Sequence, residues 1–393
     1  MSVNVMNFEQ AATLLTSLHE QATGQTAITP TDESGFVSMA QATLRAGYDP
    51  IINAISQMIG QTLIAVRPYG AKLMGLEKSA GEWGGIKRKI NFIEGTPEDE
   101  QSYNLTDGSA IDQYVVKKPK ILETHYYGRA IYSDIYTLGI EAQLKTAFTS
   151  SSEFGRFMSG LMQHFANQRE QWLEDMRRGL VSNFIAAKYT ADGGTGDMVV
   201  HLLTEYNAAT GGSYTSTTIK DPANFAGFTR WLYARLNTLA RLMSERSEKF
   251  QQRVNGKPIM RHTPAADLKV YMLAEYKDMI DAMGLAVTYN DNYLKTADTE
   301  GISFWQSIDD SDEIQITPAY VDSDLAIAAA SPVTLTDVVG VMFDRDACGY
   351  HIYRDTLETS PYNARGSYYN MFPHVEVQLM NDITEKGIVL ILD

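Results

Sequence analysis

The chain has 393 residues, of which 33 are basic and 48 acidic, giving a formal net charge of −15 at pH 7. It is 44% hydrophobic and 21% charged, which excludes wholesale disorder and is enough apolar material for one or two packed domains. The acidic excess repels nucleic acid on average, so it excludes a protein whose whole surface binds DNA. A single cysteine, Cys348, excludes an intramolecular disulfide and fits a reducing cytoplasm. The apolar runs are far shorter than the ~20 residues of a membrane helix, so we expect no contact with a membrane.

Residues 1–40 are polar and weakly patterned, and Pro30 interrupts them. This pattern predicts an N-terminal arm rather than a domain. A helix is then predicted to start at Asp49-Pro50, because aspartate suits the N-cap and proline suits the first helical position. Isoleucines recur at helical spacing after it, and Arg67-Pro68 is expected to end the helix.

Two segments between residues 84 and 125 are predicted to form a long β-hairpin. The outgoing strand covers 86–92, and the returning strand covers 114–122, where Pro119 favours a sheet edge. The arms are basic and the connecting tip is acidic. Two strands alone bury little apolar surface, so this hairpin needs another surface to lie on. Its charged residues are therefore the candidate contacts between subunits: Lys87, Arg88, Lys89, Glu98, Asp99, Glu100, Lys117, Lys118 and Lys120.

A long helix is predicted over about 150–188. Ser150 and Glu153 match a capping box, a stripe of Phe, Met, Leu and Trp follows at helical spacing, and Gly193-Gly194 ends it. Such a helix would be ~50 Å long at 1.5 Å per residue. A compact chain of this length has a radius of gyration of only about 21 Å. The helix therefore predicts an extended molecule with the helix as its backbone.

The remaining elements alternate between helices and strands without the regular spacing of βαβ units. This irregular order predicts the α+β class. Asp221-Pro222 opens an amphipathic helix, and a short helix is predicted over 276–283. Strands are predicted over 267–273, 302–306, 313–317, 338–343, 375–379 and 387–392.

Motifs of catalysis or cofactor binding, such as G-x-S-x-G, the P-loop and H-E-x-x-H, do not occur. Cys348 and His351, with Asp344 and Asp346 nearby, are the best metal candidate but supply only half of a zinc site. The acidic turn at 309–313 lacks the glycine and final glutamate of a calcium loop. We therefore expect no catalytic, metal or cofactor site, although a hydrolase site assembled from distant residues stays open.

The order of the elements resembles the HK97-type major capsid proteins of tailed double-stranded DNA bacteriophages. Both have a polar arm, a long charged hairpin, a very long helix, an inserted α/β region and returning strands. Residues 339–347 resemble the family's strand into an Asp-Arg turn, and residues 362–370 are similar to its aromatic, Asn-rich segment. The resemblance implies an HK97-like capsid fold with an N-terminal arm, an extended β-hairpin loop, a spine helix in a peripheral domain, and an inserted axial domain.

The same resemblance implies a domain division. The arm and first helix take 1–75, the extended loop takes 80–125, and the axial domain takes 223–334. The peripheral domain comprises residues 126–222 and 335–393, and the final strand of the chain completes this domain.

The implied function is a structural major capsid protein, not an enzyme. It would self-assemble as hexamers and pentamers into an icosahedral shell enclosing packaged double-stranded DNA, without sequence-specific binding. The implied partners are a portal protein and a separate scaffolding protein, with assembly in the bacterial host cytoplasm and a final place in the virion capsid. An encapsulin-type compartment shell is the main alternative. Another virion component or an unrecognised hydrolase is less favoured.

Overall fold

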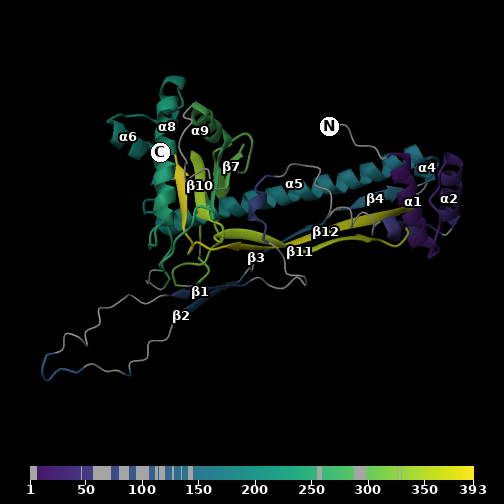
Figure 1. Cartoon of the computed structure of the whole chain (residues 1–393), viewed down its shortest axis with the longest axis horizontal. Helices are drawn as coiled ribbons and strands as arrows, with labels where there is room; N and C mark the ends of the chain where they lie inside the picture. Colours follow the sequence, from purple (N-terminus) through teal and green to yellow (C-terminus); the bar gives the residue numbers. More distant parts are fainter. Residues whose placement is uncertain are drawn as a thin grey trace.

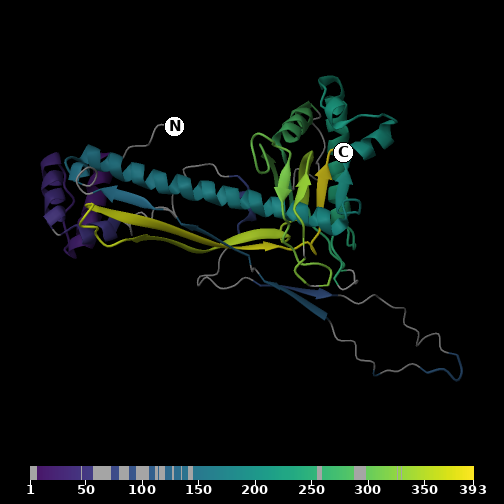
Figure 2. The same ribbon diagram turned by 180° about the vertical axis from the view of Figure 1, so that it is seen from behind.

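The structure is a computed structural model of the chain, and Figures 1 and 2 show an elongated molecule built along one helix. A cluster of short helices lies at one end of this helix, and a five-stranded sheet with its own helices lies at the other. A long sheet runs beside the helix between them. The structure describes residues 7–45, 47–55, 72–78, 88–93, 106–110, 114, 120–125, 128–133, 135–139, 145–254, 259–286, 298–324, 326–328 and 330–393.

The central helix, α5, covers Ser151–Asp192 and is the predicted long helix. Its 42 residues span about 63 Å. Ser150 caps it by accepting a hydrogen bond from the Glu153 amide at 3.2 Å, which is one half of the predicted capping box. Gly193, at φ 67°, ends the helix in the left-handed conformation. Within the described ranges, no helix is both long and apolar enough to cross a membrane.

The N-terminal segment corrects the prediction of an arm over residues 1–40. It folds into α1 (Phe8–Thr23) and α2 (Glu33–Arg45), which pack on the first half of α5. The sequence does carry a start signal, because Asn7 and Gln10 form a reciprocal capping box at α1. The apolar stripe is weak in sequence because alanines and threonines form much of the buried face. Such small side chains are buried only where another helix or strand packs closely against them.

An aromatic cluster joins these helices to α5. Phe36 is fully buried, with ring centroids 6.3 Å from Phe8 and 5.8 Å from Phe154. The Glu33 carboxylate also accepts hydrogen bonds from the amide and hydroxyl of Ser151, at 2.7 and 2.6 Å. A charged side chain on α2 therefore helps to cap the start of the spine. The helix over 48–55 and α4 (Lys145–Ala147) complete this end.

A long antiparallel sheet runs beside α5, in the strand order β11-β12-β3, with β4 also paired to β12. The strand β12 extends the predicted strand 375–379 in both directions. Its residues Val375 and Val377 are buried on the side that faces the helix. This sheet is the largest difference from the sequence prediction, because three of its strands were not expected. The strands are β3 (Gly128–Ser133), β4 (Tyr136–Gly139), β11 (Cys348–Thr359) and β12 (Tyr368–Asn381).

A five-stranded mixed sheet, in the order β5-β13-β10-β6-β7, forms the other end of the molecule. The predicted strands 338–343 and 387–392 lie here, as β10 and β13, and every residue of β10 is buried. These two strands therefore lie in a different sheet from β11 and β12, although the sequence prediction places all of 335–393 in one peripheral domain. β10 lies between β6 and β13, a pairing that no local pattern encodes. The strands are β5 (Val199–His201), β6 (Leu268–Leu273), β7 (Asp298–Ile302), β10 (Val338–Asp344) and β13 (Gly387–Ile391).

Helices flank this second sheet (Figure 1). Two further short strands, over 314–316 and 333–335, pair with each other. The amphipathic helix expected after Asp221-Pro222 is present as α8, and the short helix over 276–283 extends to Ala286 as α9. The predicted strand over 302–306 is displaced, because β7 ends at Ile302. The elements are α6 (Leu202–Thr210), α7 (Ser216–Ile219), α8 (Pro222–Ser244), α9 (Ala274–Ala286), β8 (Ile314–Ile316) and β9 (Val333–Leu335).

A buried lysine joins the end of α5 to this second sheet. The Lys188 ammonium donates to the backbone carbonyls of Phe250 at 3.0 Å, Ile383 at 3.0 Å and Glu385 at 2.7 Å. Burial lowers the pKa of Lys188 to about 7, although the nearby carboxylates of Asp382 and Glu385 oppose that shift. The ammonium has three N–H donors, which match these three carbonyls. The hydrogen bonds fix the position of the turn before β13 relative to the helix.

We expect Phe36→Ala to lower the free energy of unfolding by about 3–5 kcal/mol, because it empties a closed aromatic core. Ile28→Ala is the matched control, since Ile28 is 92% exposed in the connection between α1 and α2. That change should stay within about 0.5 kcal/mol. Chemical denaturation of both variants measures the difference. Equal stabilities would show that residues 8–45 do not belong to the folded core.

Candidate assembly surfaces

A two-stranded ribbon projects from the body of the molecule below the five-stranded sheet (Figures 1 and 2). It consists of β1 (Arg88–Ile93) and β2 (Lys120–His125). The strands are antiparallel, with Arg88 opposite His125 and Ile93 opposite Lys120. The predicted antiparallel pairing is therefore confirmed, but the returning strand is displaced, because only residues 120–122 of the predicted 114–122 lie in β2 and Tyr114 is in a turn.

Three of the predicted contact residues, Arg88, Lys89 and Lys120, lie in the paired strands of the ribbon. Residues 106–110 are exposed, and Gly108 there adopts a φ of 86°, which a residue with a side chain rarely takes. Ile90 is 56% exposed, so the ribbon leaves apolar surface uncovered in a single subunit. The other predicted contact residues lie outside the described residues: Lys87, Glu98, Asp99, Glu100, Lys117 and Lys118.

The chain on both sides of the ribbon is fastened to the long sheet. On the C-terminal side, β3 follows β2 closely and pairs with β12. On the N-terminal side, residues 72–78, which include the short helix η1 (Met74–Leu76), lie along β11. The Lys78 amide donates to the Tyr350 carbonyl at 2.9 Å, and Glu77 forms a parallel bridge with the same residue. We call residues 72–78 the strap.

A buried arginine of α5 holds the strap. Arg177 is 1% exposed, and its Nε donates to the Tyr350 hydroxyl at 2.8 Å, which in turn donates to Glu77 at 3.2 Å. Burial raises the pKa of Tyr350 to about 12, so its hydroxyl keeps the proton that it donates. Arg177 also donates to the Lys72 carbonyl at 3.4 Å and lies 3.9 Å from the Glu170 carboxylate. The guanidinium thus joins the strap, the long sheet and the helix.

The strap also contacts the five-stranded sheet. The Leu73 amide donates to the carboxylate of Glu300 on β7 at 2.9 Å, and the Lys72 amide donates to Glu174 on α5 at 3.4 Å. Glu174 pairs with Arg178 at 2.7 Å, and Arg178 donates to the Phe304 carbonyl. The strap, the helix and both sheets therefore meet in one network of charged hydrogen bonds.

The long sheet presents apolar side chains on the face turned away from α5. Tyr132 and Tyr136 face the helix, with ring centroids 5.6 Å from Trp172 and 5.5 Å from Phe165. Because side chains alternate along a strand, Ile131 of β3 points to the opposite face, and Ile135 lies just before β4. These two isoleucines are 58% and 64% exposed, so this face is a second candidate assembly surface.

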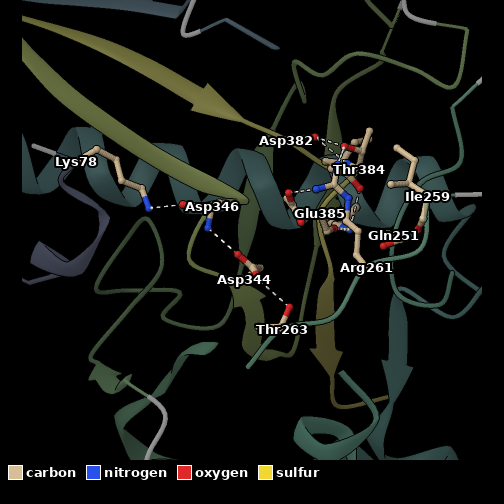
Figure 3. A network of polar contacts seen from close by, with 12 residues as sticks. Lys78, Gln251, Ile259, Arg261, Thr263, Asp344, Asp346, Asp382, Thr384 and Glu385 are labelled. Atoms are coloured by element: carbon tan, nitrogen blue, oxygen red, sulfur yellow. Dashed lines mark hydrogen bonds and ion pairs between the residues drawn. The ribbon is translucent and has the colours of Figure 1, made fainter. Parts of the chain in front are cut away.

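The candidate metal residues are placed for structural roles. Cys348 and His351 are both buried at the start of β11, three positions apart on a strand, which directs their side chains to opposite faces. Asp344 accepts from Thr263 at 2.7 Å, and Asp346 accepts from Lys78 at 3.3 Å (Figure 3). In the part of the chain that the structure describes, no three His, Cys, Asp or Glu side chains are grouped to hold a metal.

Comparison with known proteins identifies the family. The sequence matches the family model of Phi29-like phage major capsid proteins over residues 13–390. The chain belongs to this family. Its fold is similar to a capsid structure of Staphylococcus phage Andhra, with a TM-score of 0.52 and 10% identity over 84% of this chain and 86% of that one. It is equally similar, at TM-score 0.52 and 8% identity, to a structure of the head fiber and inner core protein of native bacteriophage P68, over 82% of this chain and 85% of that one. No curated protein sequence matches the chain.

This Phi29-like capsid protein is a structural component of the virion capsid with an HK97-like α+β fold, which confirms the resemblance stated from sequence. Capsid assembly means that copies of the chain associate with one another to form a shell. In the terms of that fold, α5 is the spine helix and the ribbon is the base of the extended loop.

We expect Arg177→Met to lower the free energy of unfolding by about 1–3 kcal/mol, because the buried Tyr350 hydroxyl and the Lys72 carbonyl lose their donor, and Glu170 is left with Arg169 as its partner. Arg156→Met is the control on the same helix, since the Arg156 side chain is 63% exposed and pairs with Glu153 at the surface. It should cost at most about 1 kcal/mol. Denaturant titrations of both variants test this. A small effect at Arg177 would mean that the strap is held by its backbone contacts alone.

Proposed function

We propose that copies of this capsid protein assemble as hexamers and pentamers into a closed icosahedral shell around packaged double-stranded DNA. The observation that carries the proposal is the projecting ribbon. A two-stranded ribbon with an exposed Ile90 is a poor structure for an isolated subunit, and it gains stability by lying on a neighbour. A closed shell repeats each such contact many times, so each one can be weak.

The proposed docking surface for the ribbon is the outer face of the long sheet on the next subunit. That face exposes Ile131, Ile135 is exposed just before β4, and an apolar patch on each partner is the usual centre of a protein interface. The charges around the ribbon then set its orientation on the neighbour. The proposed contact residues remain Lys87, Arg88, Lys89, Glu98, Asp99, Glu100, Lys117, Lys118 and Lys120.

We assign the five-stranded sheet with α8 and α9 to the axial domain, and the spine helix with the long sheet to the peripheral domain. This assignment moves 199–201, 338–344 and 387–391 into the axial domain, because their strands belong to the same five-stranded sheet as β6 and β7. The N-terminal helices join the peripheral domain, since their core is shared with the first half of α5.

The proposed partners are a portal protein and a separate scaffolding protein, with assembly in the bacterial host cytoplasm. A separate scaffold is supported by the packing of α1 and α2, which are built into a core rather than left as a removable segment. Contact with the packaged DNA is proposed to be independent of base sequence, because a subunit with a net charge of −15 gains little from binding phosphate over most of its surface.

Deleting residues 96–110 should leave a folded subunit that no longer closes into shells, because the deletion removes the end of the hairpin and spares both cores. Negative-stain electron microscopy and sedimentation measure closed particles, and the melting temperature checks the fold. Replacing the same residues with a Gly-Ser segment of equal length is the matched control for length. Normal shells from the deletion variant would show that this part of the hairpin is not an assembly element.

The shell itself is tested by imaging the intact protein after expression alone and together with the genes that neighbour its own. We expect closed shells or hexameric sheets in at least one of the two preparations. Discrete monomers or dimers in both would contradict the proposed assembly.

A further inference from the structure

A basic segment covers the last turn of α8 and the chain that follows it, and the proposed contact between ribbon and sheet does not use it. Residues 241–261, which we call the basic loop, contain six basic and two acidic residues, a net charge of +4. The other 27 of the 33 basic and 46 of the 48 acidic residues lie elsewhere, so the rest of the chain has a net charge of −19. The basic loop is thus opposite in sign to the molecule that carries it.

Several of the basic side chains that the structure describes in this loop are exposed, and so are two apolar side chains. Arg241 and Lys249 are exposed, as is Arg253, which pairs with Glu248 at 3.1 Å. Leu242 and Met260 are 43% and 42% exposed. Hydrogen bonds between the backbones of residues 247 and 261, at 3.0 and 3.2 Å, bring the two halves of the loop together.

The arginine at the end of the loop has a different role. Arg261 turns inward, where its guanidinium donates to Glu385 and to the Thr384 hydroxyl (Figure 3). It therefore fastens the loop to the turn before β13 and is not counted as part of the exposed surface.

Hydrogen bonds from beneath hold residues 245–250 of the loop. The Phe250 carbonyl accepts from Lys188 Nζ at 3.0 Å and from the Gly387 amide at 2.8 Å, and Phe250 itself adopts a φ of 68°, which is uncommon for a residue with a side chain. Lys386 Nζ donates to the Glu245 carbonyl and the Ser247 hydroxyl, both at 2.8 Å. A surface that is already ordered loses little conformational entropy when it binds.

We propose that the basic loop is a second contact surface between copies of this chain, and that it receives an acidic surface of a neighbouring subunit. The proposal rests on the proposed shell and names one of its contacts. A second copy carries a large acidic excess outside its own basic loop, so opposite charges meet. Arginine and methionine are enriched in protein interfaces, and the exposed Leu242 and Met260 suit a protein partner better than a DNA phosphate backbone.

The test compares two double variants that remove the same charge. Arg241→Gln with Lys249→Gln changes the basic loop, whereas Arg230→Gln with Arg365→Gln changes exposed arginines elsewhere. Each is produced together with the neighbouring genes, and closed particles are quantified by sedimentation at low and high salt. A roughly fivefold weaker contact, equivalent to about 1 kcal/mol, is expected for the basic loop variant at low salt. Because the contact repeats around the shell, the yield of closed particles should fall by more than this fivefold loss of affinity at one contact.

The outcomes separate the possibilities. The proposal is supported if the basic loop variant keeps its melting temperature, loses particles relative to the control variant, and no longer responds to salt as the unaltered protein does. Equal yields from the two variants, with normal shells from the unaltered protein, would overturn the proposal and leave the shell intact. Normal particle yield with less DNA retained would also overturn it, and would assign the loop to nucleic acid. If the unaltered protein forms no shells, the proposed function itself fails.

Discussion

The structure depends on one constraint, which is that a helix of 42 residues must be buried at both ends by different parts of the chain. Its first half carries Phe154 and Phe165 into a core made by the N-terminal helices, and its second half carries Phe184 into a core made by the five-stranded sheet. Helices in proteins gain most of their stability from such packing. The spine therefore exists because two cores hold it, and the distance between those cores is set by the 1.5 Å rise of the helix.

Buried cations determine how the parts meet along this helix. Arg177 and Lys188 lie about three turns apart on α5, and the first holds the strap while the second holds the turn before β13. Burying a charge is costly unless hydrogen bonds satisfy it, so each cation tolerates few arrangements of its partners. An apolar residue at either position would leave the backbone carbonyls bound there without their donor. The charges instead give a defined geometry to the place from which the ribbon leaves the body.

This rigidity suits a subunit that binds its neighbours through projecting and exposed features. The ribbon, the outer face of the long sheet and the basic loop all lie outside the two cores, and each combines exposed apolar side chains with nearby charges. Within one copy these features are left uncovered, and the contacts proposed above would cover them between copies. The acidic excess of the chain then has a role, because it keeps separate subunits apart except where a basic surface meets it.

The sequence by itself determined the features that have a local cause. A continuous apolar stripe with Ser150 and Gly193 at its ends predicts the spine. Two predicted strands around an acidic tip predict the paired ribbon. The order of these elements along the chain led to the capsid family. The strap could not be predicted, because Arg177 resembles any polar residue on a helix until Tyr350 meets it. Only the tertiary structure decided that 338–344 and 387–391 join the five-stranded sheet, and that residues 8–45 are core. Those choices rest on contacts between distant segments, where burial against a particular neighbour outweighs the weak preferences of each segment alone.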